Sequence, residues 1–160
     1  MTLWFLVHGC DTVSGGAVEL SWKLRPASSS LEDKFVDCNS GKELTGEVRD
    51  IVLHWLVNGE EGAKAWRCDF NHGVTGFELA EGTAQLWVTP ACVNADASPD
   101  TYISPAIVER TVVRGETVSL GAVELVVAVS DCSDPSVTTA QPGKRPCICC
   151  AGETCLPPTK

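Results

Sequence analysis

The sequence predicts an all-β protein, an antiparallel β-sandwich of about seven to nine short strands followed by a Cys-rich C-terminal tail. Three observations support this fold class. Apolar and polar residues alternate along several segments, which is typical of half-buried strands. Turn-forming residues separate those segments at short intervals. No window of about 11 residues carries the apolar stripe of an amphipathic helix.

The first predicted strand spans residues 17–25 and ends at Pro26. Its apolar residues recur at every second position and predict one buried face: Val18, Leu20, Trp22 and Leu24. The stretch that follows is mixed in composition, and we expect at most a short strand at 35–38.

The second predicted strand, 48–57, is apolar on both faces. One face carries Ile51, Leu53, Trp55 and Val57, and the other carries Val52, His54 and Leu56. A strand of this kind is expected to be partly covered or central in a sheet. Residues 58–62, Asn-Gly-Glu-Glu-Gly, are a turn signal, and 65–70 is the expected return strand.

Further alternating segments complete the sandwich. The expected strands are 74–79, 83–89, 107–113 and 117–129, the last counted as one or two strands. Residues 80–82 are expected to join the first two of these as a hairpin, and 114–116 to form a turn. Residues 93–105 form a predicted polar loop.

Two stretches resemble a known architecture. In Phe77–Val88 an apolar residue precedes a glycine turn and an alternating strand, a pattern similar to that of transthyretin-like and other immunoglobulin-like bacterial modules. Residues 114–125 resemble the closing strands of the same modules. The resemblance covers roughly residues 16–130 and implies architecture, not catalytic residues.

Composition excludes several classes of protein. The chain has 160 residues, of which 44% are hydrophobic and 21% charged, a balance that excludes wholesale disorder. A formal net charge of −9 repels phosphate backbones, so we expect no nucleic-acid partner. No apolar run reaches the roughly 20 residues of a membrane-spanning helix.

Nine cysteines indicate an oxidising compartment. One CxxC spacing occurs, from Cys147 to Cys150 within the tail cluster, but no second one accompanies it, so the paired spacing of the usual zinc finger is absent. Because the count is odd, we set Cys10 apart and predict disulfides among Cys38, Cys68, Cys92, Cys132, Cys147, Cys149, Cys150 and Cys155. Two pairings, Cys38–Cys68 and Cys92–Cys132, each flank a hairpin-like unit; the connectivity of eight cysteines stays open among 105 possibilities.

The N-terminal residues MTLWFLVHGC resemble the end of a bacterial lipoprotein signal peptide, in which an apolar run and a small residue precede a cysteine. The resemblance implies cleavage before Cys10 and a lipid on its thiol; the alternative is an apolar strand with a buried cysteine. The expected organisation is a partial signal-peptide-like segment (1–9), a tether (10–15), the sandwich (16–130) and a Pro- and Cys-rich tail (131–160).

These features predict a non-enzymatic lipoprotein of the bacterial cell envelope. Lipid on Cys10 would hold the sandwich at a membrane, in the periplasm or at the cell surface, where it binds an unidentified protein or glycan partner without a cofactor. The alternative is a soft-metal-binding protein that uses the thiols of Cys147, Cys149, Cys150 and Cys155.

Histidines offer little for catalysis. A third hypothesis is a hydrolase built on His54 or His72, but the chain has no nucleophile elbow, phosphate loop or HExxH motif. Cys68 and His72 have the spacing of two zinc ligands, although a site needs about four and a disulfide would consume the thiol. Glu60 and Glu61 are expected as solvated turn residues. We therefore predict neither a catalytic nor a metal site.

Overall fold

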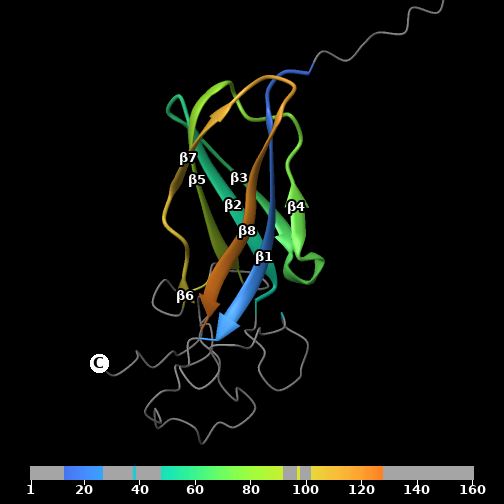
Figure 1. Cartoon of the computed structure of the whole chain (residues 1–160), viewed down its shortest axis with the longest axis vertical. Helices are drawn as coiled ribbons and strands as arrows, with labels where there is room; N and C mark the ends of the chain where they lie inside the picture. The colour runs from blue at the N-terminus through green and yellow to red at the C-terminus, as the bar shows by residue number, and fades with distance from the viewer. Residues whose placement is uncertain (1–12, 27–37, 39–47, 92–96, 98–101, 128–160) are drawn as a thin grey trace, which may run out of the picture.

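The computed structural model describes residues 13–26, 38, 48–91, 97 and 102–127, which form two four-stranded β-sheets around one hydrophobic core (Figure 1). The strands are β1 (Ala17–Pro26), β2 (Asp50–Val57), β3 (Glu60–Arg67), β4 (His72–Val74), β5 (Gly82–Ala91), β6 (Tyr102–Ile103), β7 (Val108–Val112) and β8 (Thr117–Val127). One sheet has the order β4-β1-β8-β6, and the other has the order β3-β2-β5-β7. The all-β, sandwich-like prediction is confirmed at this level.

Strand β1 lies in the middle of the first sheet. Its predicted apolar face is buried, with Leu20 and Trp22 at 1% and 2% exposure. It pairs antiparallel with β4 but parallel with β8, whereas the sequence predicts antiparallel pairing throughout. Alternation reveals which face a side chain occupies, but it does not reveal strand direction, because both kinds of ladder have the same two-residue period.

A two-residue turn joins β2 and β3. Asn58 and Gly59 have φ values of 53° and 86°, and positive φ at both central positions is what a type I′ turn requires. The ladder begins at once, with Val57 paired to Glu60. The prediction that Glu60 and Glu61 lie in the turn is therefore wrong: both belong to β3, which starts earlier than expected and ends at Arg67.

The predicted hairpin across 80–82 is also wrong. Strand β4 pairs with β1 in the first sheet, and β5 pairs with β2 and β7 in the second. The chain crosses between the sheets at Leu79, which is fully buried and exchanges backbone hydrogen bonds of 2.9 and 3.2 Å with Gly16. Burial of this side chain at the end of the sandwich favours the crossing over a local hairpin.

The later strands follow the sequence pattern. Strand β7 lies within the predicted 107–113, and β8 falls within 117–129 as one strand. The turn at 114–116 is present, with Gly115 at a φ of 74°. The predicted loop 93–105 contains the short strand β6, which pairs with β8.

Two tryptophan rings of the sandwich pack onto glycines, one on the adjacent strand of the same sheet and one on a strand of the other sheet. The Trp55 ring occupies the place that a Cβ at Gly62 would take, and the Trp66 ring does the same at Gly73. Trp66 also stacks on Trp22, with ring centroids 6.3 Å apart. The close approach of these rings to the backbone therefore depends on the missing side chains.

We expect Gly73→Ala to lower the free energy of unfolding by about 1 to 3 kcal/mol, because the added methyl group forces the Trp66 ring out of its place. Chemical denaturation measures the change. Gly76→Ala is the matched control, since a Cβ there meets nothing within 4 Å. Equal free energies of unfolding for the two variants would contradict this account of the packing.

Candidate functional site

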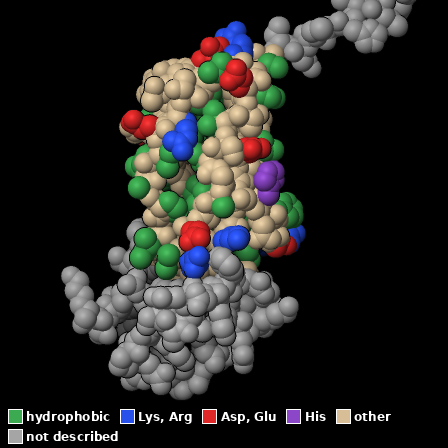
Figure 2. All heavy atoms as spheres, viewed as in Figure 1, with side chains coloured by type: hydrophobic (Ala, Val, Ile, Leu, Met, Phe, Trp, Pro, Cys, Tyr) green, Lys and Arg blue, Asp and Glu red, His purple; other side chains and the backbone are tan. Residues whose placement is uncertain are grey.

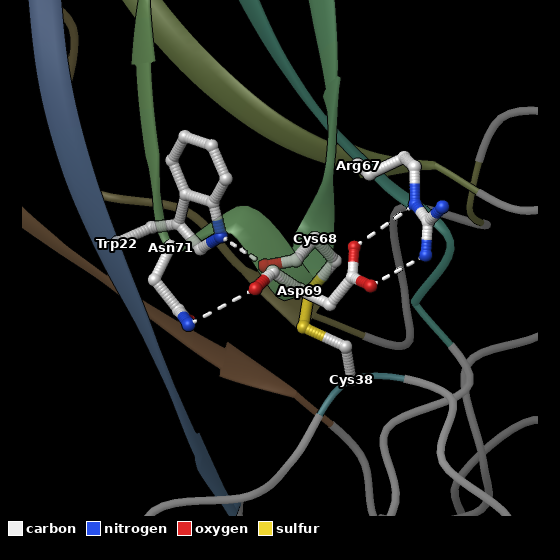
Figure 3. Close-up of polar contacts among 6 residues, drawn as sticks. All are labelled: Trp22, Cys38, Arg67, Cys68, Asp69 and Asn71. Carbon is white, nitrogen blue, oxygen red and sulfur yellow. Dashed lines mark hydrogen bonds and ion pairs between the residues drawn. A yellow bond between two sulfur atoms is a disulfide. The ribbon is translucent and has the colours of Figure 1, made fainter.

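A disulfide between Cys38 and Cys68 closes one end of the sandwich (Figure 3). The two Cα atoms lie 5.7 Å apart, across a sequence separation of 30 residues. This is one of the two pairings suggested by the sequence. Cys68 is fully buried and begins the 3-10 turn η2 (Cys68–Phe70), which follows β3.

The disulfide end also connects the two sheets. Trp22, from β1, donates its indole N–H to the carbonyl oxygen of Cys68 at 2.8 Å. On the outside, Arg67 Nε donates to Asp69 Oδ1 at 3.0 Å, and the guanidinium lies 5.4 Å from the centre of the Phe70 ring. The buried Trp22 hydrogen bond thus joins β1 of one sheet to the turn that follows β3 of the other.

The zinc interpretation of Cys68 and His72 is wrong. The Cys68 sulfur is bonded to Cys38 and is no longer a thiolate ligand. His72 lies on β4, with its Cα paired to that of Ser21 on β1. The Ser21 hydroxyl donates to the carbonyl oxygen of Gly121 at 3.3 Å. Within the described residues, no group of three or more His, Cys, Asp or Glu side chains is placed to hold a metal ion.

The outer face of the first sheet is largely polar over its central strands β1 and β8, whereas its edge strands carry the exposed Val74 on β4 and Ile103 on β6. Figure 2 shows side chains of both charges dispersed over the face that β1 and β8 present. Arg25 on β1 donates hydrogen bonds to both carboxylate oxygens of Glu124 on β8, from Nε to Oε2 at 2.7 Å and from Nη2 to Oε1 at 3.2 Å. A face of this kind is the ordinary solvated side of a sandwich.

The Arg25 hydrogen bond, followed by smaller charge effects, lowers the pKa of the Glu124 carboxyl below its ordinary value. Because the folded-state pKa is depressed, the pair stabilises the fold above the ordinary carboxyl pKa. That contribution is lost as the pH falls through the folded-state pKa. We expect Arg25→Gln to raise the Glu124 pKa, as measured by NMR titration of the carboxyl carbon. An unchanged pKa would contradict the assigned cause.

The outer face of the second sheet is different. Its centre is a largely apolar surface without Asp, Glu, Lys or Arg, which we call the apolar face: Val52, His54 and Leu56 on β2, Ala63 and Ala65 on β3, and Trp87 on β5. Ala63 and Ala65 are exposed, and the other four are half-buried. The sequence predicts that β2 is central or covered. The structure shows it central, between β3 and β5.

His54 and Trp87 form the middle of the apolar face. They are directly opposite each other on β2 and β5, and their rings stack with a centroid distance of 5.3 Å and an interplanar angle of 6°. His54 Nε2 shares a 2.8 Å hydrogen bond with Thr89 Oγ1. The imidazole is thereby held flat against the indole. The sequence places His54 on the second face of its strand, but its pairing with Trp87 depends on the register between β2 and β5.

An open groove of about 550 Å³ runs along the inner side of β3, beside Trp55 and Gly62. Its charged lining residues include Glu60, Lys64 and Glu78, and Lys64 Nζ lies 3.9 Å from Glu78 Oε1. This groove was not predicted from the sequence. The only signal was glycine at a position where a Cβ would collide with the Trp55 ring, and that requires the pairing of β2 with β3.

The other predicted site residues lie outside the described residues. They are Cys10, with its predicted lipid, and Cys92, Cys132, Cys147, Cys149, Cys150 and Cys155. The Cys92–Cys132 pairing and the soft-metal alternative therefore remain predictions.

Comparisons of the chain with protein-family models, curated proteins and solved structures find no match. In the part of the chain that the structure describes, no helix is long and apolar enough to cross a bilayer.

Proposed function

We propose that this chain is a non-enzymatic binding module of the bacterial cell envelope, and that it binds a protein through its apolar face. The observation that carries the proposal is the contrast between the two outer faces. One has charges of both signs, whereas the other presents aliphatic side chains around a stacked His54–Trp87 pair. A contiguous apolar patch with a polar border is typical of a protein-binding surface.

The border of the apolar face supports a protein partner. Glu61 and Arg67 flank it on β3, while Gln85 and Glu109 flank it on the opposite side, joined by a 3.3 Å hydrogen bond. Aromatic residues at the centre and charged or amide groups at the rim are the arrangement that stable protein interfaces use. The strand at the centre of this face, β2, is hydrogen-bonded on both sides, to β3 and to β5.

The compartment and the anchor rest on different observations. The Cys38–Cys68 disulfide supports an oxidising compartment, because such bonds are rare in the cytosol. The anchor rests on the signal-peptide-like sequence before Cys10 alone. Lipid at this residue would keep the sandwich beside a membrane, in the periplasm or at the cell surface.

Site-specific photo-crosslinking tests the binding face. A photoreactive residue in place of Leu56, within the apolar face, is expected to give a discrete protein adduct in the native host. The same residue in place of Lys23, on the polar face, is the matched control and is expected to give none. Adducts of equal yield from both positions, or none from Leu56, would contradict the proposal.

Metabolic labelling with a palmitate analogue tests the anchor separately. We expect the wild-type protein, expressed from its native gene, to take up the label and the Cys10→Ser variant to lose it. An unlabelled wild-type protein would reject the lipid anchor, while leaving the binding face to be judged by the crosslinking result.

A further inference from the structure

Among the strands that the structure describes, β3 is the longest edge strand. It has eight residues at one end of the order β3-β2-β5-β7, whereas the other edge strands, β7, β4 and β6, have five, three and two. It contains no proline, and its register with β2 is unbroken. Proline, bulges and short length are three of the devices that prevent an edge from pairing with another chain, and β3 uses none of these three. It does carry charged side chains, at Glu60, Glu61, Lys64 and Arg67, so a partner strand has to match their order.

The turn determines which backbone groups of β3 face away from β2. In a two-residue hairpin the flanking residues, here Val57 and Glu60, exchange both hydrogen bonds, and every second pair does the same. Counting every second pair from Val57 and Glu60 leads to Arg49 and Cys68, and the Cys68 N–H does donate to the Arg49 carbonyl oxygen, at 2.9 Å. The outward-facing backbone groups of β3 therefore belong to the other four residues: Glu61, Ala63, Ala65 and Arg67. All four residues are exposed.

A second copy of β3 fits this edge in one particular register. Antiparallel pairing about a two-fold axis places residues of the same face opposite each other. The symmetric register that pairs all four outward-facing residues sets Ala63 opposite the partner's Ala65, and Glu61 opposite the partner's Arg67. Symmetry repeats each of these pairs, so every outward N–H and C=O group of β3 gains a partner.

The charges of β3 agree with this register. Its acidic residues lie in the first half and its basic residues in the second, so antiparallel self-pairing brings opposite charges together, whereas parallel pairing in register would align like charges. The Asp69 carboxylate accepts hydrogen bonds from Nε and Nη2 of Arg67, which leaves the Nη1 edge for the partner's Glu61.

The two-fold axis falls at Lys64, which would face its own copy. Two ammonium groups would repel each other if they were alone. Each one, however, has Glu78 of its own chain at 3.9 Å, so the axis would carry two positive and two negative charges. The groove beside β3 can therefore accept the second copy without a net charge at the centre.

We propose that this chain forms a symmetric dimer by antiparallel pairing of β3 with β3 of a second copy. The two four-stranded sheets become one eight-stranded sheet, and the two apolar faces join into a single two-fold symmetric surface. The dimer requires neither the lipid anchor nor a partner protein. A result that rejects the dimer therefore does not reject the proposed function, and the reverse is also true.

Mixing two charge variants tests the register. The full-length chain with Cys10→Ser in every sample is studied by sedimentation velocity at about 10 to 500 μM. We expect a reversible wild-type dimer, and a dissociation constant raised at least about tenfold in Glu61→Arg and in Arg67→Glu, because each change sets like charges opposite each other twice. An equimolar mixture of the two variants restores both attractive pairs and is expected to form a heterodimer.

Backbone variants test the edge. Ala63→Pro removes one outward-facing N–H and is expected to abolish the dimer with little change in the melting temperature of the monomer. Lys64→Pro is the matched control, because it removes an inward N–H of the β2 ladder and is expected to lower that temperature markedly. Non-reducing denaturing gels confirm that the dimer is not covalent.

Two results would overturn the proposal. One is a wild-type chain that stays monomeric at 500 μM. The other is a dimer that persists in Ala63→Pro, or in both charge variants measured separately.

Discussion

Replacing Trp22 with alanine is expected to lower the free energy of unfolding by about 3 to 5 kcal/mol, the largest effect of any single substitution in the described residues. Its side chain is 2% exposed, stacks on Trp66, and donates the hydrogen bond to the Cys68 carbonyl oxygen at 2.8 Å. The substitution therefore opens a large cavity between the sheets and removes one of two hydrogen bonds that the Cys68 carbonyl oxygen accepts; the bond from the Asn71 N–H, at 3.2 Å, remains. Equilibrium denaturation in urea measures the loss.

Two further variants divide this effect into its parts. Trp22→Phe keeps most of the ring but removes the N–H, and is expected to cost about 1 to 3 kcal/mol. Trp87→Ala removes a tryptophan from the half-buried outer face, so a clearly smaller loss is expected there. If Trp22→Ala costs no more than Trp87→Ala, then Trp22 is not the centre of the core.

Removing the Cys38–Cys68 disulfide is the second prediction of large effect. We expect the double variant Cys38→Ala with Cys68→Ala to lose roughly 3 to 4 kcal/mol, because the bond closes a 30-residue loop and restricts the unfolded chain. Cys68 is fully buried, so alanine avoids placing a new polar group in the core. The denaturation midpoint of the oxidised protein measures the change.

Reductant provides the control for this prediction. Reduction is expected to lower the midpoint of the wild-type protein at least to that of the oxidised double variant, since both then lack the same crosslink. A double variant as stable as the oxidised wild type would show that the loop between residues 38 and 68 is already restricted in the unfolded state.

The candidate binding face was only partly predictable. The pattern of Val52, His54 and Leu56 indicates an apolar second face on β2, and the structure shows why that strand tolerates it, since β3 and β5 flank it on both sides. Trp87 could not be added from the sequence. Its position opposite His54 depends on the register between strands that are about 30 residues apart. The alternating pattern within one strand does not indicate which residue of another strand lies opposite.

The wrong prediction of a hairpin at residues 80–82 has the same cause, because it also depended on contacts between distant parts of the chain. Asn58-Gly59 predicts its turn correctly because the signal lies within the two residues that adopt positive φ. Residues 80–82 also carry a turn signal, yet the strands on either side belong to different sheets. Leu79 accounts for the difference: its burial at the end of the core is a long-range gain of free energy that a local turn propensity does not contain.

By itself, the sequence determined the all-β class, the buried face of β1 and the Asn-Gly turn, since each depends on residues close together or on simple periodicity. Tertiary structure alone decided the parallel pairing of β1 with β8, the assembly of the apolar face and the open edge of β3. Side-chain alternation shows which face of a sheet a residue occupies. Which strands pair, and whether they run parallel or antiparallel, is decided only when two sheets bury a common core.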